Sequence, residues 1–127
     1  MLFRSREQVS LLAYSPLGQG YLSGKYEDGA LPAGSRKRLF DRLGRYEQGN
    51  GPKAISTYIS VARRHGLDPA QMAIAFVVCR PFVTSTIIGA TTMDQLETDI
   101  AAAELKLPDA VLADIDAVHL NHPNPCP

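Results

Sequence analysis

Two short apolar runs, each breaking into small, hydroxyl-bearing and glycine residues, constrain the fold of this chain most strongly. The first run covers residues 9–14 and breaks into SPLGQG at 15–20, and the second covers 83–88 and breaks into GATT at 89–92. A buried parallel strand that ends at a phosphate-binding loop has this pattern. Because helical sequence separates the two runs, we expect two successive strand-to-helix units whose loops open on the same side of a sheet or barrel.

Charge and composition exclude several functional classes. Thirteen Lys and Arg residues balance thirteen Asp and Glu residues, so there is no general attraction to nucleic acid or to an anionic membrane. No apolar run approaches the roughly 20 residues of a membrane span, and residues 1–7 lack the apolar core of a signal peptide. Cys79 and Cys126 match no metal-ligand spacing. We therefore expect a cytoplasmic protein with reduced thiols and with no nucleic-acid, membrane or metal partner.

Hydrophobic spacing predicts the order strand, long loop, two helices, strand, two helices. The strands are expected at 9–14 and 83–88, and the long loop at 15–52 is glycine-rich and therefore functional or mobile. The four helices are predicted at about 53–65, from 69 up to Pro81, from 92 through 103, and at about 109–119, with Asp68 and Thr91 or Thr92 as caps and Gly66 as a left-handed terminator.

The same spacing predicts which side chains are buried. The strand at 9–14 suits burial on both faces, which would pack Tyr14 into the interior. The predicted helical stripes are formed by Ile55, Ile59 and Ala62 and by Leu112, Ile115 and Val118.

The two strand endings also carry the groups that bind phosphate. Backbone N–H groups at 89–91 would lie at a helix N-terminus, where the helix dipole and unpaired donors favour an anion. Hydroxyls could come from Ser15, Thr91 and Thr92, and cations from the long loop at Lys25, Arg36, Lys37 and Arg38. A threonine before a helix is also explained as a simple cap, and a basic cluster in a loop as solvated surface. No arrangement of nucleophile, base and acid is indicated, so no catalytic residue is predicted.

Three segments resemble the aldo-keto reductase family. Residues 13–26 (AYSPLGQGYLSGKY) are similar to its seventh-strand signature, and residues 87–96 (IIGATTMDQL) to its eighth-strand and final-helix signature. Between them, residues 65–73 (HGLDPAQMA) resemble the helix that precedes the last strand. The resemblance runs from about residue 8 to the end and is strongest to the branch with potassium-channel beta subunits and related bacterial reductases.

The resemblance implies an α/β fold: the C-terminal segment of a (β/α)8 TIM barrel, with about the last two βα units plus a C-terminal helix. Residues 1–127 would form one partial domain in which 15–52 covers the cofactor. It also implies binding of NADPH without a Rossmann domain and reduction of aldehydes and ketones. The implied cofactor residues are Ser15, Leu17 and Gly20 along the pyrophosphate, Lys25, Ser35 and Arg36 over it, Gly89, Thr91, Thr92 and Gln95 at the 2′-phosphate end, and Asp99 near the adenine.

Two positions depart from the family pattern. Many members have Glu-Asn where this chain has Thr98 and Asp99, which weakens the expected adenine contacts. Many also place Arg or Lys at the position of Thr92, so NAD stays open as an alternative to NADP.

The family's catalytic Asp, Tyr, Lys and His come from the first four strands, and none has a counterpart here. A full barrel takes roughly 250 residues, so 127 residues cannot supply eight βα units. We expect a chain that is inactive alone and that associates with itself or with the missing N-terminal part, because open strands expose edges and apolar faces. A non-catalytic nucleotide- or partner-binding module and an inert remnant are the alternatives.

Overall fold

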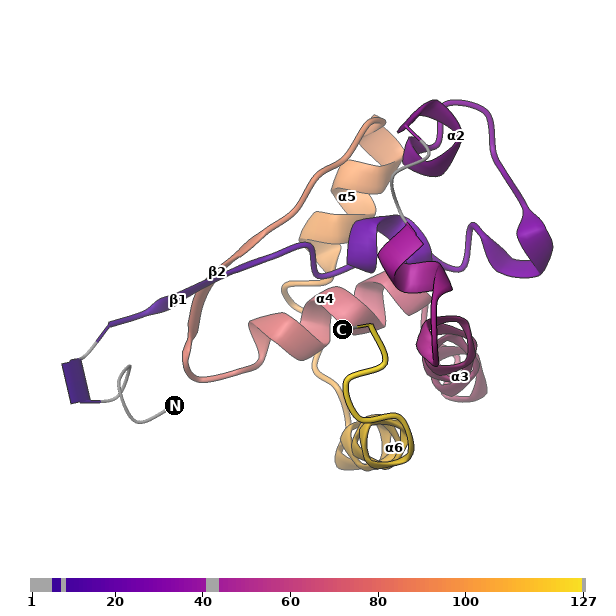
Figure 1. Cartoon of the computed structure of the whole chain (residues 1–127). Helices are drawn as coiled ribbons and strands as arrows, with labels where there is room; N and C mark the ends of the chain where they lie inside the picture. Colours follow the sequence, from indigo (N-terminus) through magenta and orange to yellow (C-terminus); the bar gives the residue numbers. More distant parts are fainter. Residues whose placement is uncertain (1–5, 8, 41–43, 127) are drawn as a thin grey trace.

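The computed structural model describes residues 6–7, 9–40 and 44–126. Strand β1 (Leu11–Tyr14) pairs with strand β2 (Val83–Ile87) in parallel, with Tyr14 opposite Ile87 and a register shift between Leu11 and Leu12. Both chain segments therefore leave the sheet at the same end, which confirms the predicted parallel pair. Figure 1 shows the two strands as an arm that extends from the helical part of the molecule.

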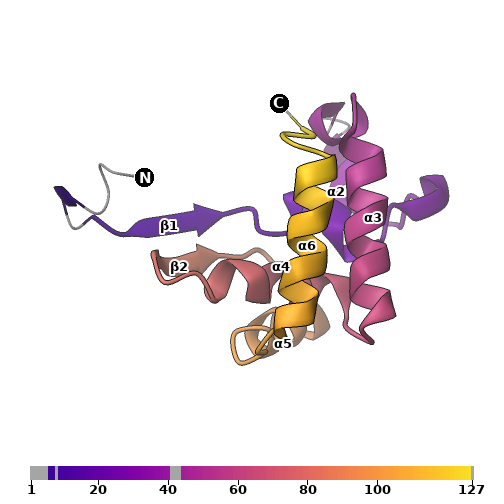
Figure 2. The ribbon, with the colours of Figure 1, turned by 90° about the horizontal axis from the view of Figure 1, so that it is seen from below.

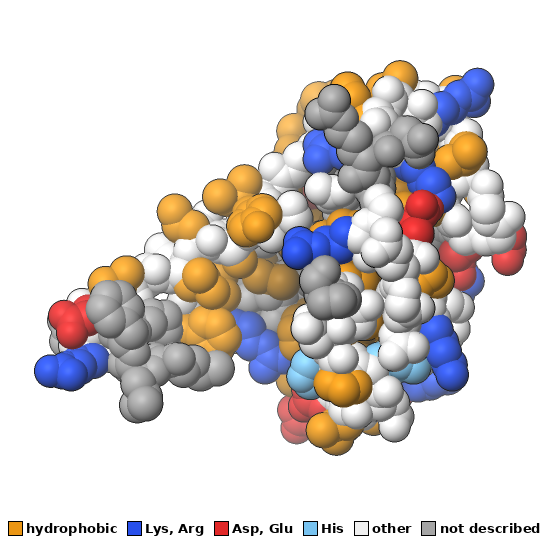
Figure 3. All heavy atoms as spheres, in the orientation of Figure 1, with side chains coloured by type: hydrophobic (Ala, Val, Ile, Leu, Met, Phe, Trp, Pro, Cys, Tyr) orange, Lys and Arg blue, Asp and Glu red, His pale blue; other side chains and the backbone are white. Residues whose placement is uncertain are grey.

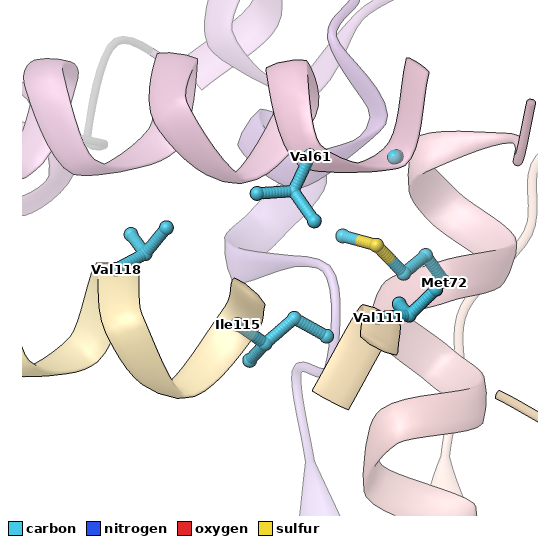
Figure 4. Packing of buried hydrophobic residues seen from close by; sticks show 6 residues of the cluster. Val61, Met72, Val111, Ile115 and Val118 are labelled. Carbon is cyan, nitrogen blue, oxygen red and sulfur yellow. The ribbon is translucent and has the colours of Figure 1, made fainter. Parts of the chain in front are cut away.

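Four helices form the body of the protein: α3 (Gly51–Arg64), α4 (Pro69–Val78), α5 (Met93–Ala101) and α6 (Asp109–Asn121). Helix α6 packs along α3, as seen in Figure 2, and α4 contacts α3, α5 and β2. The main apolar cluster lies where α3, α4 and α6 meet (Figure 4), and its buried members are Val61, Ala62, Met72, Val111, Ile115 and Val118.

Local chemistry explains where these helices begin and end. The Asp68 carboxylate accepts a hydrogen bond from the backbone N–H of Gln71 at 2.9 Å, and Pro69 occupies the first turn of α4. The backbone of Gly66 has φ +67°, the left-handed conformation that ends α3. Thr92 caps α5 through its hydroxyl, which accepts from the N–H of Gln95 at 3.3 Å. The predicted caps are therefore confirmed, with Thr92 rather than Thr91 at the N-cap.

The helical stripes are confirmed in part. Ile59 and Ala62 on α3 and Ile115 and Val118 on α6 are buried, whereas Ile55 and Leu112 are only half-buried. Val111 takes the buried place expected for Leu112. The helix ends also differ by a few residues from the prediction. Helix α4 ends at Val78 rather than near Pro81, α5 ends at Ala101 rather than at 103, and α6 continues to Asn121 rather than ending at about 119.

The predicted burial of the strands is wrong. Leu12 is 59% exposed, Tyr14 is 77% exposed, and Ile87 is 53% exposed. Helix α4 packs against β2, but within the described residues the sheet consists of β1 and β2 alone, so no further strand removes these side chains from water. Figure 3 accordingly shows hydrophobic side chains spread over the arm that the strands form.

The segment 15–52 contains more structure than a loop. Short helical turns occur at η1 (Gly18–Ser23), η2 (Glu27–Gly29), α2 (Arg36–Phe40) and η3 (Gly44–Glu47), while residues 41–43 of this predicted loop lie outside the described residues. Residues 1–5, in the N-terminal stretch that lacks the apolar core of a signal peptide, also lie outside the described residues. No helix among the residues described is long and apolar enough to cross a bilayer.

Candidate functional site

The chain turns sharply as it leaves β1, at the first predicted phosphate-binding loop. Ser15 follows the strand with φ +54°, and its carbonyl accepts a hydrogen bond from the N–H of Gly18 at 2.9 Å. The carbonyl of Leu17 accepts from the N–H groups of Gly20 and Leu22 at 3.0 and 3.1 Å. These bonds close the turn, and the Ser15 side chain is exposed to solvent.

Gly20 makes room for the side chain of Lys25. A Cβ atom at Gly20 would lie 2.6 Å from Cε of Lys25 and 2.7 Å from its Nζ, closer than atoms can approach. Gly20 also has φ +99°, a conformation that side-chain-bearing residues rarely adopt. The positive charge of Lys25 lowers the pKa of Asp99 in α5. The structure thus brings two predicted site residues, Gly20 and Lys25, close together.

Asp99, a further predicted site residue on α5, is buried, with 5% of its surface exposed. Burial raises the pKa of Asp99 above its ordinary value, and the nearby carboxylate of Asp68 raises it further. The positive charge of Lys25 opposes both effects and lowers the pKa. Desolvation is the largest of the three influences on this pKa, so ionisation of Asp99 costs the folded protein free energy.

This cost predicts a gain in stability for Asp99→Asn at neutral pH. Because the folded state binds a proton at Asp99 more tightly than the unfolded chain, wild-type stability decreases as pH rises through the folded-state pKa. Thermal unfolding followed by circular dichroism should therefore give a higher midpoint for the variant at pH 7. The gain should shrink as pH falls toward the ordinary pKa of an aspartate. The exposed Asp28→Asn variant is the control, and a lower midpoint for Asp99→Asn would show that Lys25 stabilises the carboxylate more than burial penalises it.

The residues predicted at the second strand ending form their own hydrogen-bonded group. The Gln95 side-chain oxygen accepts bonds from both the backbone N–H and the hydroxyl of Thr91 at 3.0 Å. Together with the cap at Thr92, these bonds fix the start of α5, and Gly89 just before it is exposed with open space around its Cβ position. Asp99 lies seven positions after Thr92, a distance of about 10 Å along the helix axis. The capping interpretation is confirmed for Thr92, and phosphate binding by this group stays a prediction.

Ser35 and Arg36 stand at the start of α2. The Ser35 hydroxyl is buried and has no hydrogen-bond partner among the residues that the structure describes. Arg36 next to it is exposed. Lys37, a further candidate cation, forms an ion pair with Glu47 of the same segment. Its role toward a phosphate stays a prediction.

A tyrosine cluster around Lys37 was missed by sequence reasoning. Tyr21 and Tyr26 are buried, and Tyr46 packs against them. The signal available in the sequence was the concentration of three of the five tyrosines within residues 21–46. Spacing alone did not show that they contact one another.

An apolar groove of about 400 Å³ lies between α3, α4 and α6, and Pro16 and Leu22 of the segment after β1 also line it. Tyr58, Met72, Phe76, Ile115 and His119 are among the residues that line it. Burial raises the pKa of the Tyr58 hydroxyl, and the negative charge of Asp116 raises it further. Sequence reasoning did not identify this groove because its lining comes from helix faces that read as ordinary core.

Comparisons with known proteins give one consistent relationship. The family model described as the Aldo/keto reductase family matches residues 2–120. Protein tas of Escherichia coli is 57% identical over 121 residues, which cover 95% of this chain and 35% of that protein. A putative voltage-gated potassium channel subunit beta of Schizosaccharomyces pombe is 34% identical over 112 residues, and an uncharacterized oxidoreductase of Mycobacterium tuberculosis is 37% identical over 109 residues. These alignments cover 83% of this chain and 32% of each relative, so the chain spans about a third of the length of the curated relatives it matches.

Proposed function

Because this chain belongs to the aldo/keto reductase family, we propose that it supplies the C-terminal, cofactor-holding part of a cytoplasmic NAD(P)H-dependent aldo-keto reductase. The observation that carries the proposal is the parallel pairing of β1 and β2, because it makes the segments that follow Tyr14 and Ile87 leave the sheet at the same end. The Asp, Tyr, Lys and His that the family uses for catalysis have no counterpart here, so we propose that the chain binds the cofactor but does not complete the reaction alone.

The residues present fit a dinucleotide. Gly20 leaves room for the Lys25 ammonium group, a cation that can pair with a phosphate, and the buried Ser35 hydroxyl lacks a partner among the described residues. We assign Ser15, Leu17 and Gly20 to the pyrophosphate, Lys25, Ser35 and Arg36 to the covering segment, Gly89, Thr91, Thr92 and Gln95 to the 2′-phosphate end, and Asp99 to the adenine side. NADP is the proposed cofactor, and the bound group would supply a hydride to an aldehyde or ketone.

Lys25 and Arg36 contribute positive charge to this site. Cations and backbone N–H groups together stabilise a pyrophosphate more than either does alone. The ionised Asp99 opposes an anionic ligand, so Lys25 also serves to neutralise it. We therefore place Lys25 between the carboxylate and the bound phosphates.

We further propose that β1 and β2 are the last two strands of a (β/α)8 barrel, followed by α5 and the C-terminal helix α6. Their parallel pairing and the exposed apolar residues Leu12, Tyr14 and Ile87 support this assignment, since barrel strands have neighbours on both edges and layers on both faces. The upstream strands of the barrel are the partner that this surface fits best.

Without that partner, the strand arm should bind a second copy of the chain. Purified protein is expected to sediment as concentration-dependent oligomers, because unpaired edges and apolar side chains associate. Leu12→Lys should shift the distribution toward the monomer. The matched control is Leu120→Lys, at an apolar residue on α6 that is 79% exposed and far from the strands in sequence. Equal effects of the two variants would contradict association through the strands.

A titration of the purified chain with NADPH tests the proposed function. The chain contains no Trp, so the emission of the reduced nicotinamide can be followed directly. A saturable change is the expected result, and its absence would overturn cofactor binding and favour an inert remnant. Addition of an aldehyde to the complex should then cause no oxidation of NADPH. Carbonyl-dependent oxidation by this chain alone would contradict the proposal that the catalytic groups lie elsewhere.

A further inference from the structure

We infer that five residues, Tyr21, Tyr26, Lys37, Tyr46 and Glu47, form a latch that positions Ser35 and Arg36. The inference rests on the proposed function, in which Ser35 and Arg36 cover a dinucleotide. The five are positioning residues, because they act through Ser35 and Arg36 rather than through contact with the ligand. We call them the tyrosine latch.

The aromatic rings form the base of the latch. The ring centroids of Tyr21 and Tyr26 are 4.9 Å apart, and those of Tyr21 and Tyr46 are 5.3 Å apart. Such tilted pairs attract one another beyond the area that they bury. Tyr21 and Tyr26 are each only 7% exposed, although they lie in a segment of short turns. The three tyrosines therefore form a small second hydrophobic core within the segment 15–52.

Lys37 is held by both its backbone and its side chain. Its backbone N–H donates to the Tyr26 hydroxyl at 3.3 Å, and its ammonium nitrogen lies 5.8 and 5.9 Å from the ring centroids of Tyr21 and Tyr26. The same ammonium group pairs with Glu47, whose carboxylate also accepts a bond from the Tyr21 hydroxyl at 2.9 Å. The hydrogen bond from Lys37 is the main cause that lowers the pKa of Glu47. The Glu47 carboxylate, the tyrosine ring faces and the Tyr26 hydroxyl thus all contact Lys37.

Tyr46 anchors the C-terminal end of the segment 15–52. A Cβ at Gly18 would lie 3.3 Å from a ring carbon of Tyr46, and a Cβ at Gly51 would lie 2.6 Å from its carbonyl oxygen. Tyr46 is therefore seated between η1 and the first residue of α3, and glycine is required at Gly51 for this close approach. Consequently the chain on both sides of 41–43 is anchored to the same aromatic cluster.

The position of Ser35 and Arg36 depends on these contacts. Helix α2 has only five residues, whereas isolated helices shorter than about 12 residues are marginal in water. Gly29 and Gly34, on the approach to α2, have nothing within 4 Å of their Cβ positions. Lys37 directly follows Ser35 and Arg36 in the chain. The contacts of Lys37 with the tyrosines and with Glu47 therefore fix the start of α2.

Proteolysis of the free protein tests the fastening without any cofactor. Lys37→Met keeps the aliphatic stem and removes the charge, and the matched control Arg38→Met changes an exposed neighbour. Chymotrypsin cleavage after Leu39 or Phe40, identified by mass spectrometry, should be at least tenfold faster in Lys37→Met and unchanged in Arg38→Met. Glu47→Gln should accelerate the same cleavage. Equal rates in all variants and wild type would overturn the latch.

NADPH titrations of the same variants test the positioning role. Both Lys37→Met and Glu47→Gln should weaken binding about fivefold or more, with circular dichroism unchanged. The control Lys53→Met, at an exposed lysine of α3, should stay within twofold of wild type. If Lys37 contacted the cofactor phosphates itself, Glu47→Gln would strengthen binding by freeing the ammonium group, and that result would overturn the inference. Absence of binding by wild type would reject the proposed function and the positioning role together. The chymotrypsin cleavage rates would still show whether the tyrosine latch holds the start of α2.

Discussion

Met72→Ala is expected to reduce the free energy of unfolding by about 2–5 kcal/mol. Met72 is 3% exposed and extends from α4 into the cluster where Val61 of α3 and Ile115 of α6 meet (Figure 4). Truncation to alanine removes the apolar contacts of three helices at once and leaves a cavity. Complete domains are stable by only about 5–15 kcal/mol, and an open sheet contributes little burial here. The variant should therefore lose much of its helical signal at 25 °C or unfold at a far lower urea concentration.

The matched control for this prediction is Met93→Ala. Met93 begins α5 and is 65% exposed, so the same truncation removes little buried surface. Urea unfolding followed by circular dichroism at 222 nm should place Met93→Ala within about 0.5 kcal/mol of wild type. If both variants shifted the transition equally, the α3–α4–α6 cluster would not be the stabilising core of this chain.

Gly20→Ala should abolish most dinucleotide binding. The added Cβ would meet Cε and Nζ of Lys25 at 2.6 and 2.7 Å, so the end of the lysine side chain must move. That movement displaces the positive charge that we place next to the pyrophosphate. The expected loss in NADPH affinity is tenfold or more, which corresponds to about 1.4 kcal/mol or more.

Backbone strain is controlled by Gly29→Ala. Gly29 has φ +77° and nothing within 4 Å of its Cβ position, so alanine there meets a similar conformational penalty without a clash. We expect this variant to bind NADPH within about twofold of wild type at a similar loss of stability. Equal losses of affinity in the two variants would show that strain, and not displacement of Lys25, weakens binding.

Local signals in the sequence predicted local structure well. Asp68 and Thr92 cap the helices that follow them, and Gly66 adopts the left-handed conformation expected past a helix end. Each of these features depends on residues within one helical turn. The parallel pairing of the two strands was predictable as well, because intervening helices let two apolar runs lie side by side in the same direction.

Long-range contacts explain what the sequence could not predict. Tyr14 looks like a packed strand residue, yet it is exposed because burial requires neighbouring strands and layers that these residues do not provide. The segment 15–52 reads as a loop, yet Tyr21 and Glu47, 26 residues apart, hydrogen-bond and hold short turns in place. No short spacing relates Lys25 to Asp99, although their charges interact in the fold. The local structure at each strand ending was therefore predictable, but the long-range contacts were not.

Hydrogen–deuterium exchange with and without saturating NADPH tests most directly whether both strand endings hold one dinucleotide. The amides of residues 15–25 and 89–95 should exchange more slowly in the complex, and both segments should gain protection over the same range of NADPH concentration. The helix faces that line the apolar groove should be unchanged. Saturable binding that protects those helix faces, or only one of the two strand endings, would contradict a shared dinucleotide site.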